Sequence, residues 1–258
     1  MFNSVSIKEG LGDCLIGAAC AQEFSKKIKK IKFCTSEKLS SILSTNPYFE
    51  YSDSDNADLY LKWPSQVDKN LYNLHTNQRF AHQMGFSIDP TKTVDIFIKN
   101  KLIENRNNEK FICINSLSAE ASRRFIPIEY LNFIQDYCDK HNYKIIWIGN
   151  NNRKDEIIDI VECCNFLEKC SLFIGPVSFQ YHLAAAIKAN CLLFCSYMPY
   201  YKYSHFNKTN HIFSKRDCVL NCESNEKELR NINRCWNGCK AVDYSYEEIG
   251  FFLKRVLK

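Results

Sequence analysis

Short apolar runs alternate along the chain with longer segments that mix apolar and polar residues. Apolar runs this short are typical of strands, and continuous ones are typical of strands covered on both faces. We expect strands at residues 2–7, 31–35, 57–62, 111–115, 144–148, 171–174 and 191–195, and helices at residues 14–28, 36–44, 71–85, 127–141, 153–161, 178–186 and 246–257. Strands that alternate with helices predict an α/β fold with parallel sheets.

Residues 171–196 form the clearest unit of this pattern. An apolar strand leads into Gly175-Pro176, Ser178 is placed to cap the next helix, and a second apolar strand follows. In an open parallel sheet, ligands collect at the carboxyl ends of the strands, where a turn leads into a helix N-terminus that favours anions. This turn is therefore the first candidate for a binding site.

A junction between two domains is expected at residues 89–108, which contain a proline, many Asn and Lys residues and little periodicity. The expected domains are residues 1–100 and residues 101–258. Strands and helices alternate on both sides of the junction, so each domain is expected to contain its own parallel sheet.

The composition fits a globular protein, with 45% hydrophobic and 24% charged residues. The net charge of +5 is compatible with phosphate contacts, but it is too small and too dispersed to indicate nucleic acid. The densest basic run fits either the solvated end of a helix or a binding patch. It consists of Lys26, Lys27, Lys29, Lys30 and Lys32.

Two kinds of membrane-related segment are not expected in this sequence. No segment approaches the roughly 18 apolar residues of a membrane span. The apolar run at residues 14–21 is short, and Glu9 and Asp13 lie where a signal peptide carries positive charge. We therefore expect neither a membrane-spanning helix nor secretion.

Fourteen cysteines are an unusually high number for this length. Ten of them are scattered through the apolar segments of the chain, where a reduced cysteine behaves as a small hydrophobic residue. They are Cys14, Cys20, Cys34, Cys113, Cys138, Cys163, Cys164, Cys170, Cys191 and Cys195. Reduced cysteines favour a cytoplasmic protein.

The other four cysteines form two pairs, Cys218-x3-Cys222 and Cys235-x3-Cys239, in the Cys-rich segment 218–239. Two such pairs separated by a short loop are typical of a four-thiolate site for structural zinc or iron. Disulfides, with three possible pairings, and free structural thiols are the alternatives.

The segment Gly10-Leu-Gly-Asp13 lies between the first strand and the first helix, where we expect a loop. Glycines in such a loop let a ligand approach the backbone. A carboxylate beside the helix N-terminus can act as a general base toward a hydroxyl. The alternative is that Asp13 caps the helix, a common role for aspartate.

Residues 116–127 follow the first strand of the second half and carry Ser116, Arg123 and Arg124 just before a helix. Hydroxyl and guanidinium groups at the carboxyl end of a strand suit a phosphate or diphosphate. A solvent-exposed polar loop is the alternative.

The turn at residues 175–180 offers the Ser178 hydroxyl and backbone N–H groups to another face of the same diphosphate. His182 lies one helical turn further on. A histidine on a helix is either a packed residue with satisfied hydrogen bonds or a catalytic one, and both interpretations remain open here.

Together these segments resemble the heptosyltransferase-like glycosyltransferases of family 9, whose GT-B fold has two Rossmann-like domains facing a cleft. Gly12-Asp13 before an apolar helix resembles the family's N-terminal GD signature. Residues 115–127 resemble its donor-phosphate loop, with Arg124 three residues before Pro127. Residues 175–186 resemble its motif G-x-D-S/T-G-x-x-H-L/M-x-A-A.

Three other segments add to the resemblance. Residues 79–89 resemble the segment before the family's interdomain linker, and residues 145–149 resemble its strand ending in glycine. The paired cysteines near the C-terminus resemble the metal finger of many members. The resemblance implies an acceptor-side domain at residues 1–100 and a nucleotide-sugar domain at residues 101–258.

The resemblance implies an inverting glycosyltransferase that moves a heptose or related hexose from an ADP- or UDP-linked donor. The acceptor would be a hydroxyl group of a glycan, a lipopolysaccharide, a lipid-linked molecule or a protein. The protein would have no nucleic-acid partner, and its association with a membrane would be at most peripheral. Asp13 would be the catalytic base. The donor-binding set would be Gly12, Ser116, Arg123, Arg124, Gly149, Pro176, Ser178, Phe179 and His182. No cofactor would be needed for catalysis, and the metal at Cys218, Cys222, Cys235 and Cys239 would be structural.

Two residues depart from the family motif. Val177 stands where the family has Asp, and Phe179 stands where it has the Gly that approaches the phosphate. A bulky side chain at that position is expected to restrict backbone contact with a diphosphate. The alternative function is therefore a catalytically degenerate nucleotide-sugar-binding protein of the same fold, or a metal-stabilised interaction protein.

Overall fold

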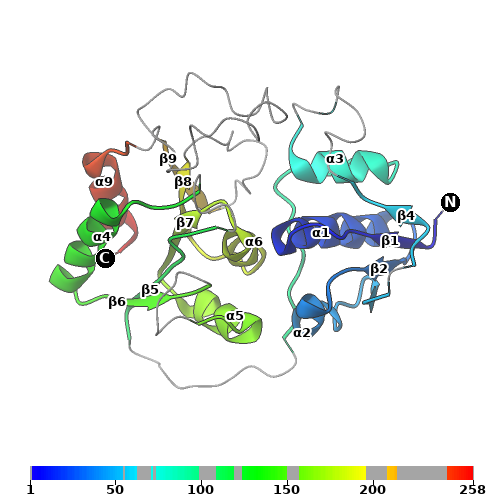
Figure 1. Ribbon diagram of the computed structural model, residues 1–258, viewed down its shortest axis with the longest axis horizontal. Helices are drawn as coiled ribbons and strands as arrows, with labels where there is room; N and C mark the ends of the chain where they lie inside the picture. The colour runs from blue at the N-terminus through cyan, green and yellow to red at the C-terminus, as the bar shows by residue number, and fades with distance from the viewer. Residues whose placement is uncertain are drawn as a thin grey trace, which may run out of the picture.

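The computed structural model describes residues 2–54, 56–62, 71, 74–98, 109–118, 124–149, 157–195, 208–213 and 243–257. Within these residues the protein forms two separate parallel sheets flanked by helices, which lie side by side in Figure 1. The expected α/β fold is therefore confirmed. The expected boundary between residues 100 and 101 lies outside the described residues.

The first sheet has the order β3-β2-β1-β4. Its strands are β1 (Ser4–Ser6), β2 (Lys32–Cys34), β3 (Glu50–Ser52) and β4 (Leu59–Tyr60). The helices of this half are α1 (Leu11–Lys27), the short 3-10 helix η1 (Glu37–Leu39), α2 (Ser40–Leu43) and α3 (Thr76–Gln83). The central strand β1 pairs in parallel with both β2 and β4, and it leads directly toward α1.

The second sheet has the order β6-β5-β7-β8-β9. Its strands are β5 (Phe111–Ile114), β6 (Lys144–Trp147), β7 (Leu172–Pro176), β8 (Cys191–Cys195) and β9 (Thr209–Phe213). Its helices are α4 (Ile128–Lys140), α5 (Ile160–Lys169), α6 (Phe179–Ala186) and α9 (Tyr246–Val256). All described pairings are parallel, so the carboxyl ends of the strands share one edge.

The continuous apolar strands of the second sheet are covered on both faces, as their sequence predicts. Alternate residues of each strand point to opposite faces. One face contributes Phe111, Cys113, Phe173, Cys191, Leu193 and Cys195 to one core cluster. The other face contributes Ile112, Ile114, Leu172, Ile174, Leu192 and Phe194 to a second cluster, shared with α4 and α9.

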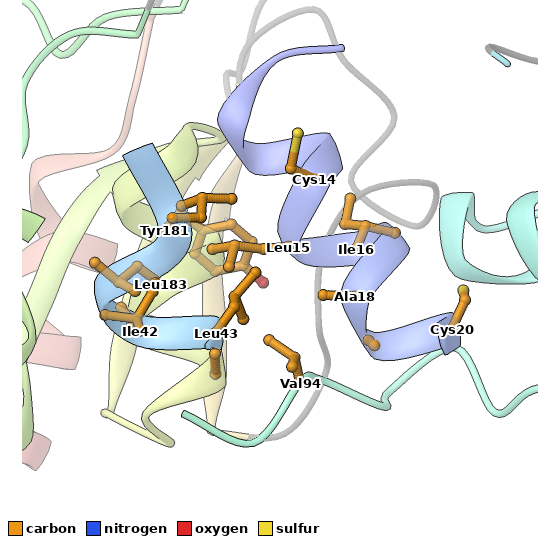
Figure 2. Packing of buried hydrophobic residues seen from close by; sticks show 14 of the residues in the cluster. Cys14, Leu15, Ile16, Ala18, Cys20, Ile42, Leu43, Val94, Tyr181 and Leu183 are labelled. Atoms are coloured by element: carbon orange, nitrogen blue, oxygen red, sulfur yellow. The ribbon is translucent and has the colours of Figure 1, made fainter. Parts of the chain in front are cut away.

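The first of these clusters is continuous with the core of the N-terminal half. It includes Val5 and Leu15 from the first half and Phe173 and Leu183 from the second. Helix α1 packs against α6, and α2 packs against α5. Figure 2 shows Tyr181 and Leu183 of α6 beside Leu15 of α1 and the side chains of α2. The two halves are therefore joined by apolar packing between helices.

Several expected elements differ from the structure. The helix expected at residues 153–161 is wrong for its described part, because Ile157 pairs with Ile148 and the helix begins only at Ile160. Asp159 fixes that start, since its Oδ1 accepts a hydrogen bond of 2.8 Å from the Glu162 N–H. Residues 153–156 lie outside the described residues.

Two strands were not predicted, β3 and β9, because both are edge strands with few buried residues and little apolar signal. The helix expected from residue 71 begins at Thr76, where His75 caps it. Its expected end at Gly85 is confirmed by a φ of 76° and by a 3.0 Å hydrogen bond from Phe86 N to Ala81 O. The helix expected at residues 36–44 is split into η1 and α2, and Ser36, which precedes η1, makes no side-chain capping bond.

The ten cysteines outside the 218–239 segment are free thiols, as expected, and all except Cys170 are buried. Burial raises the pKa of Cys138 and of Cys163 to about 12. A thiol with so high a pKa is protonated at neutral pH and unreactive. These cysteines act as small core residues in the described part of the chain.

The length and the apolar character of the described helices bear on whether any of them could span a membrane. No described helix is both long enough and apolar enough to cross a bilayer.

Candidate functional site

The first candidate segment lies at the start of α1, not in a loop as expected. The helix begins at Leu11, and Gly10 occupies its N-cap position without a side-chain capping bond. Gly12 and Asp13 therefore lie in the first helical turn, which excludes Asp13 as the N-cap. A carboxylate at this position is stabilised by the positive end of the helix dipole. A Cβ on Gly10 would lie 3.3 Å from Asp13 Oδ2, so the half-buried carboxylate sits over the start of its own helix.

The second candidate segment lies at the start of α6. Ser178 is the N-cap, as expected, and its Oγ accepts a hydrogen bond of 3.2 Å from Tyr181 N–H. The same Oγ accepts a second hydrogen bond, of 3.0 Å, from Asn115 Nδ2 at the end of β5. Asn115 is fully buried and Ser178 is 6% exposed. The hydroxyl is therefore held rigidly at the carboxyl edge of the second sheet.

The third candidate segment folds back on itself and meets the same turn. Leu117 pairs with Phe125, and the Ser118 N–H donates to the Arg124 carbonyl at 3.1 Å. Arg124 Nη1 donates a hydrogen bond of 3.1 Å to the Val177 carbonyl, just before α6. Ser116 is buried and Arg124 is hydrogen-bonded to Val177, so neither residue belongs to a freely exposed loop. Arg123 lies outside the described residues.

Gly149 ends the strand region of β6 and joins the site through Gln180. Its φ of 80° suits glycine, and a Cβ there would collide with the side chain of Gln180 on α6. Gln180 Oε1 accepts a hydrogen bond of 3.2 Å from Asn115 Nδ2. Pro176, the last residue of β7, is buried. The Asn115 amide therefore joins the end of β5 to the start of α6, and the end of β6 lies against Gln180 of that helix.

The starts of α1 and α6 meet directly. A Cβ on Gly12 would lie 2.8 Å from His182 Cδ2 and 3.6 Å from Phe179 Cα, so only a glycine permits this approach without displacement. The contact brings the turn that carries Asp13 against the helix that Ser178 caps. Residues separated by more than 150 positions in sequence thus form one site.

His182 lies inside this contact and is 6% exposed. Burial lowers the pKa of His182 to about 3, and the nearby His75 and Arg124 add to the shift. The imidazole is therefore neutral at physiological pH and supplies no positive charge to a ligand. Its burial favours the interpretation of His182 as a packed residue.

His75 is a site residue that sequence reasoning missed. It caps α3, its Nδ1 accepts a hydrogen bond of 3.1 Å from Asn77 N–H, and its own N–H donates to Gln78 Oε1 at 3.1 Å. This is the reciprocal capping arrangement more often made by Ser or Thr. The pattern His75-x-x-Gln78 was the available signal, although nothing local indicates that His75 lies near His182.

The two departures from the family motif are explained by packing. Val177 is 5% exposed and belongs to the core cluster that joins the two halves. Phe179 is half-buried and packs against the same cluster. Both residues therefore contribute to the apolar junction beneath the turn.

Among the described residues no group of three or more His, Cys, Asp or Glu side chains could hold a metal ion. The metal site expected at Cys218, Cys222, Cys235 and Cys239 lies outside the described residues. Of the other expected site residues, the structure brings Gly12, Asp13, Arg124, Ser178, Phe179 and His182 together at the junction. Ser116, Gly149 and Pro176 lie at the ends of the neighbouring strands.

Two parallel sheets, each flanked by helices and joined through the packing of α1 against α6, match the two-domain α/β architecture called GT-B. Solved structures confirm this fold. A glycosyl transferase family 9 protein from Veillonella parvula has a TM-score of 0.72 and 12% identity over 99% of this chain and 97% of that one. The heptosyltransferase WaaC of E. coli with ADP has a TM-score of 0.62 and 10% identity over 98% and 99% of the two chains.

The dodecameric iron-containing glycosyltransferase TibC of enterotoxigenic E. coli is also similar. Its TM-score is 0.66 with 15% identity over 84% of this chain, which spans only 64% of the TibC chain. No family model and no curated protein sequence matches the chain. The expected resemblance to glycosyltransferase family 9 is thus confirmed at the level of fold.

Proposed function

We propose that the protein is a glycosyltransferase that moves a sugar from a nucleotide diphosphate donor to an acceptor hydroxyl, with inversion. The observation that carries this proposal is the contact between Gly12 and His182. It brings the first turn of α1, which carries Asp13, against the first turn of α6, which Ser178 caps. A base and an anion-binding helix end on opposite sides of one junction are what a single displacement requires.

In this mechanism Asp13 removes the proton of the acceptor hydroxyl as that oxygen attacks the anomeric carbon. The bond from the anomeric carbon to the diphosphate oxygen breaks, and the nucleotide diphosphate leaves with the negative charge. Arg124, Ser116, Ser178 and the N-terminus of α6 stabilise that charge. Fixed donors of this kind supply most of the stabilisation in many enzymes, and they make a catalytic metal unnecessary in this proposal.

The donor is proposed to be an ADP- or UDP-linked heptose or related hexose. The similar structures support this class, since WaaC was solved with ADP and TibC with ADP-heptose. The acceptor is proposed to be a glycan, lipopolysaccharide, lipid-linked or protein hydroxyl, in the cytoplasm and with at most peripheral membrane association. Zinc or iron at the four C-terminal cysteines is proposed as a structural element.

A second candidate function is nucleotide-sugar binding without transfer. The observation that favours it is the packing at the turn, where Val177 belongs to the core and Phe179 packs against it. Where the family motif has an Asp and a Gly, this chain has two side chains committed to apolar contacts. Contact between the turn's backbone and a diphosphate would then be restricted.

A panel of nucleotide sugars distinguishes the two functions. Thermal shift with ADP- and UDP-linked sugars measures binding, and release of free nucleotide in the presence of acceptor glycans measures transfer. The transferase proposal predicts stabilisation by at least one donor together with nucleotide release. Stabilisation without release would favour the second candidate, and no stabilisation by any donor would contradict both.

A further inference from the structure

The hydrogen bonds that the Ser178 hydroxyl already makes determine which further bond it can form. A serine hydroxyl can accept two hydrogen bonds and donate one. Both acceptances are in use, from Tyr181 N–H at 3.2 Å and from Asn115 Nδ2 at 3.0 Å. Among the described residues the Ser178 hydrogen has no acceptor. Within the described part of the chain, this hydroxyl therefore keeps a free hydrogen, which it can donate to a ligand.

The partner that sets this orientation is itself held firmly. The N–H of Asn115 donates to the Ile174 carbonyl at 3.0 Å, which continues the pairing of β5 with β7. Gly175 allows this approach, because a Cβ there would lie only 3.0 Å from the Asn115 carbonyl oxygen. The side-chain Nδ2 of Asn115 uses its two hydrogens on Ser178 Oγ and Gln180 Oε1. Asn115 therefore has a fixed backbone and a fixed amide.

The oxygen of the Asn115 side-chain amide differs from its nitrogen in hydrogen bonding. Asn115 Oδ1 is buried and has no hydrogen-bond partner among the described residues. A buried polar atom without a partner costs free energy, so its presence requires an explanation. The fully buried side chain cannot itself contact a ligand in this structure. Its effect must pass through the groups that its Nδ2 holds.

We propose that Asn115 is a positioning residue for the donor site: it fills a lone pair of Ser178 Oγ so that the hydroxyl presents its hydrogen to the diphosphate at the N-terminus of α6. This inference rests on the proposed function. A hydroxyl that can only donate is matched to an acceptor-only oxygen such as a phosphate oxygen. With Val177 in the core and Phe179 packed against it, the turn relies on this oriented side chain for its contact with the diphosphate.

Calorimetric titration of ADP and of UDP into the full chain tests the inference. Asn115→Asp keeps the shape but offers only acceptors, so the Ser178 hydrogen turns toward the carboxylate, and affinity is expected to fall at least tenfold. Asn115→Ala removes the donor without adding charge and is expected to weaken binding by about threefold to tenfold. Asn165→Ala, which removes another buried amide on α5, is the control and leaves affinity unchanged. Thermal melting establishes that each variant is folded.

A double-mutant cycle separates positioning from a structural role. Because Asn115 acts through Ser178, Asn115→Ala in a Ser178→Ala background is expected to change nucleotide affinity by less than twofold. An undiminished effect in that background would overturn the inference, as would Asn115 variants that bind as tightly as the wild type. Wild-type protein that binds neither ADP nor UDP would instead overturn the proposed function, and this inference with it.

Discussion

The two helix starts that meet at the junction are built in opposite ways. Helix α1 begins at an uncapped glycine and carries an acidic residue, Asp13, in its first turn. Helix α6 begins at Ser178, whose hydroxyl caps the helix, and its first turn has no acidic residue. The positive end of the α1 dipole is thus matched by the protein's own carboxylate. The first turn of α6 has no carboxylate, so the positive end of its dipole remains available to an anionic ligand.

Under the proposed function, this difference fits separate chemical roles for the two helix starts. A carboxylate fixed at α1 suits a base that receives a proton, and a carboxylate-free start at α6 suits an anion that leaves. Arg124 reinforces the second role, because its guanidinium is bonded to the Val177 carbonyl beside α6. Single substitutions can remove these differences one at a time.

The largest effect is expected from the carboxylate of α1. Asp13→Asn keeps the shape but removes the base, so the rate of sugar transfer is expected to fall by about a hundredfold to ten-thousandfold. Nucleotide affinity is expected to stay within about threefold, since the proposed donor site lies on α6. Rates from nucleotide release and affinities from calorimetry measure the two. Asp136→Asn, an exposed change on α4, is the control, and retained transfer in Asp13→Asn would contradict the role of the base.

The contact between the two starts is expected to be sensitive to a single methyl group. Gly12→Ala places a Cβ 2.8 Å from His182 Cδ2 and is expected to lower the free energy of unfolding by about 1–3 kcal/mol. In Gly250→Ala in α9, the added Cβ meets Phe133 alone among the described residues, at 3.5 Å, and the substitution is expected to raise stability by up to about 1 kcal/mol. Urea denaturation measures both. Equal effects of the two substitutions would show that the helices do not pack as described.

The buried histidine predicts a pH dependence. The pKa of His182 is lowered to about 3 in the folded protein, from an ordinary value near 6.5. Between these values the unfolded chain binds a proton that the folded protein excludes, so stability falls as the pH drops below about 6.5. From pH 7 to pH 5 the loss due to His182 is about 2 kcal/mol.

Urea denaturation of the wild type and of His182→Gln across this pH range measures the effect. Glutamine does not titrate, so its stability curve is expected to be flatter by about 2 kcal/mol. Parallel curves for the two proteins would show that His182 is accessible to protons in the folded state.

The smallest effect is expected from the cap of α6. Ser178→Ala is expected to cost about 1 kcal/mol of stability, the usual cost of losing an N-cap, and to weaken ADP or UDP binding. Ser245→Ala removes the cap of α9, whose Oγ accepts from Glu248 N–H at 3.4 Å, and leaves nucleotide binding intact. Melting temperatures and titrations compare the two caps. Weaker binding in both variants would assign the effect to stability alone.

Elements with strong local signals were predicted correctly. The apolar runs at β5, β7 and β8 are buried strands, Ser178 caps α6, and Gly85 ends α3. Each of these depends on residues within a few positions of one another. Elements with weak local signals were missed. The edge strands β3 and β9 are stabilised by pairing with a neighbour, which no local pattern encodes.

The sequence by itself determined the alternation of strands and helices and the residue types at the two helix starts. Periodicity, caps and glycines act over one or two turns of chain, so they can be recognised locally. Only the tertiary structure decided that Gly12 lies against His182, that Asn115 holds Ser178, and that His75 lies near His182. These contacts depend on the strand order of two sheets and on the packing of α1 against α6. They join residues far apart in sequence, whose proximity results from packing the whole core.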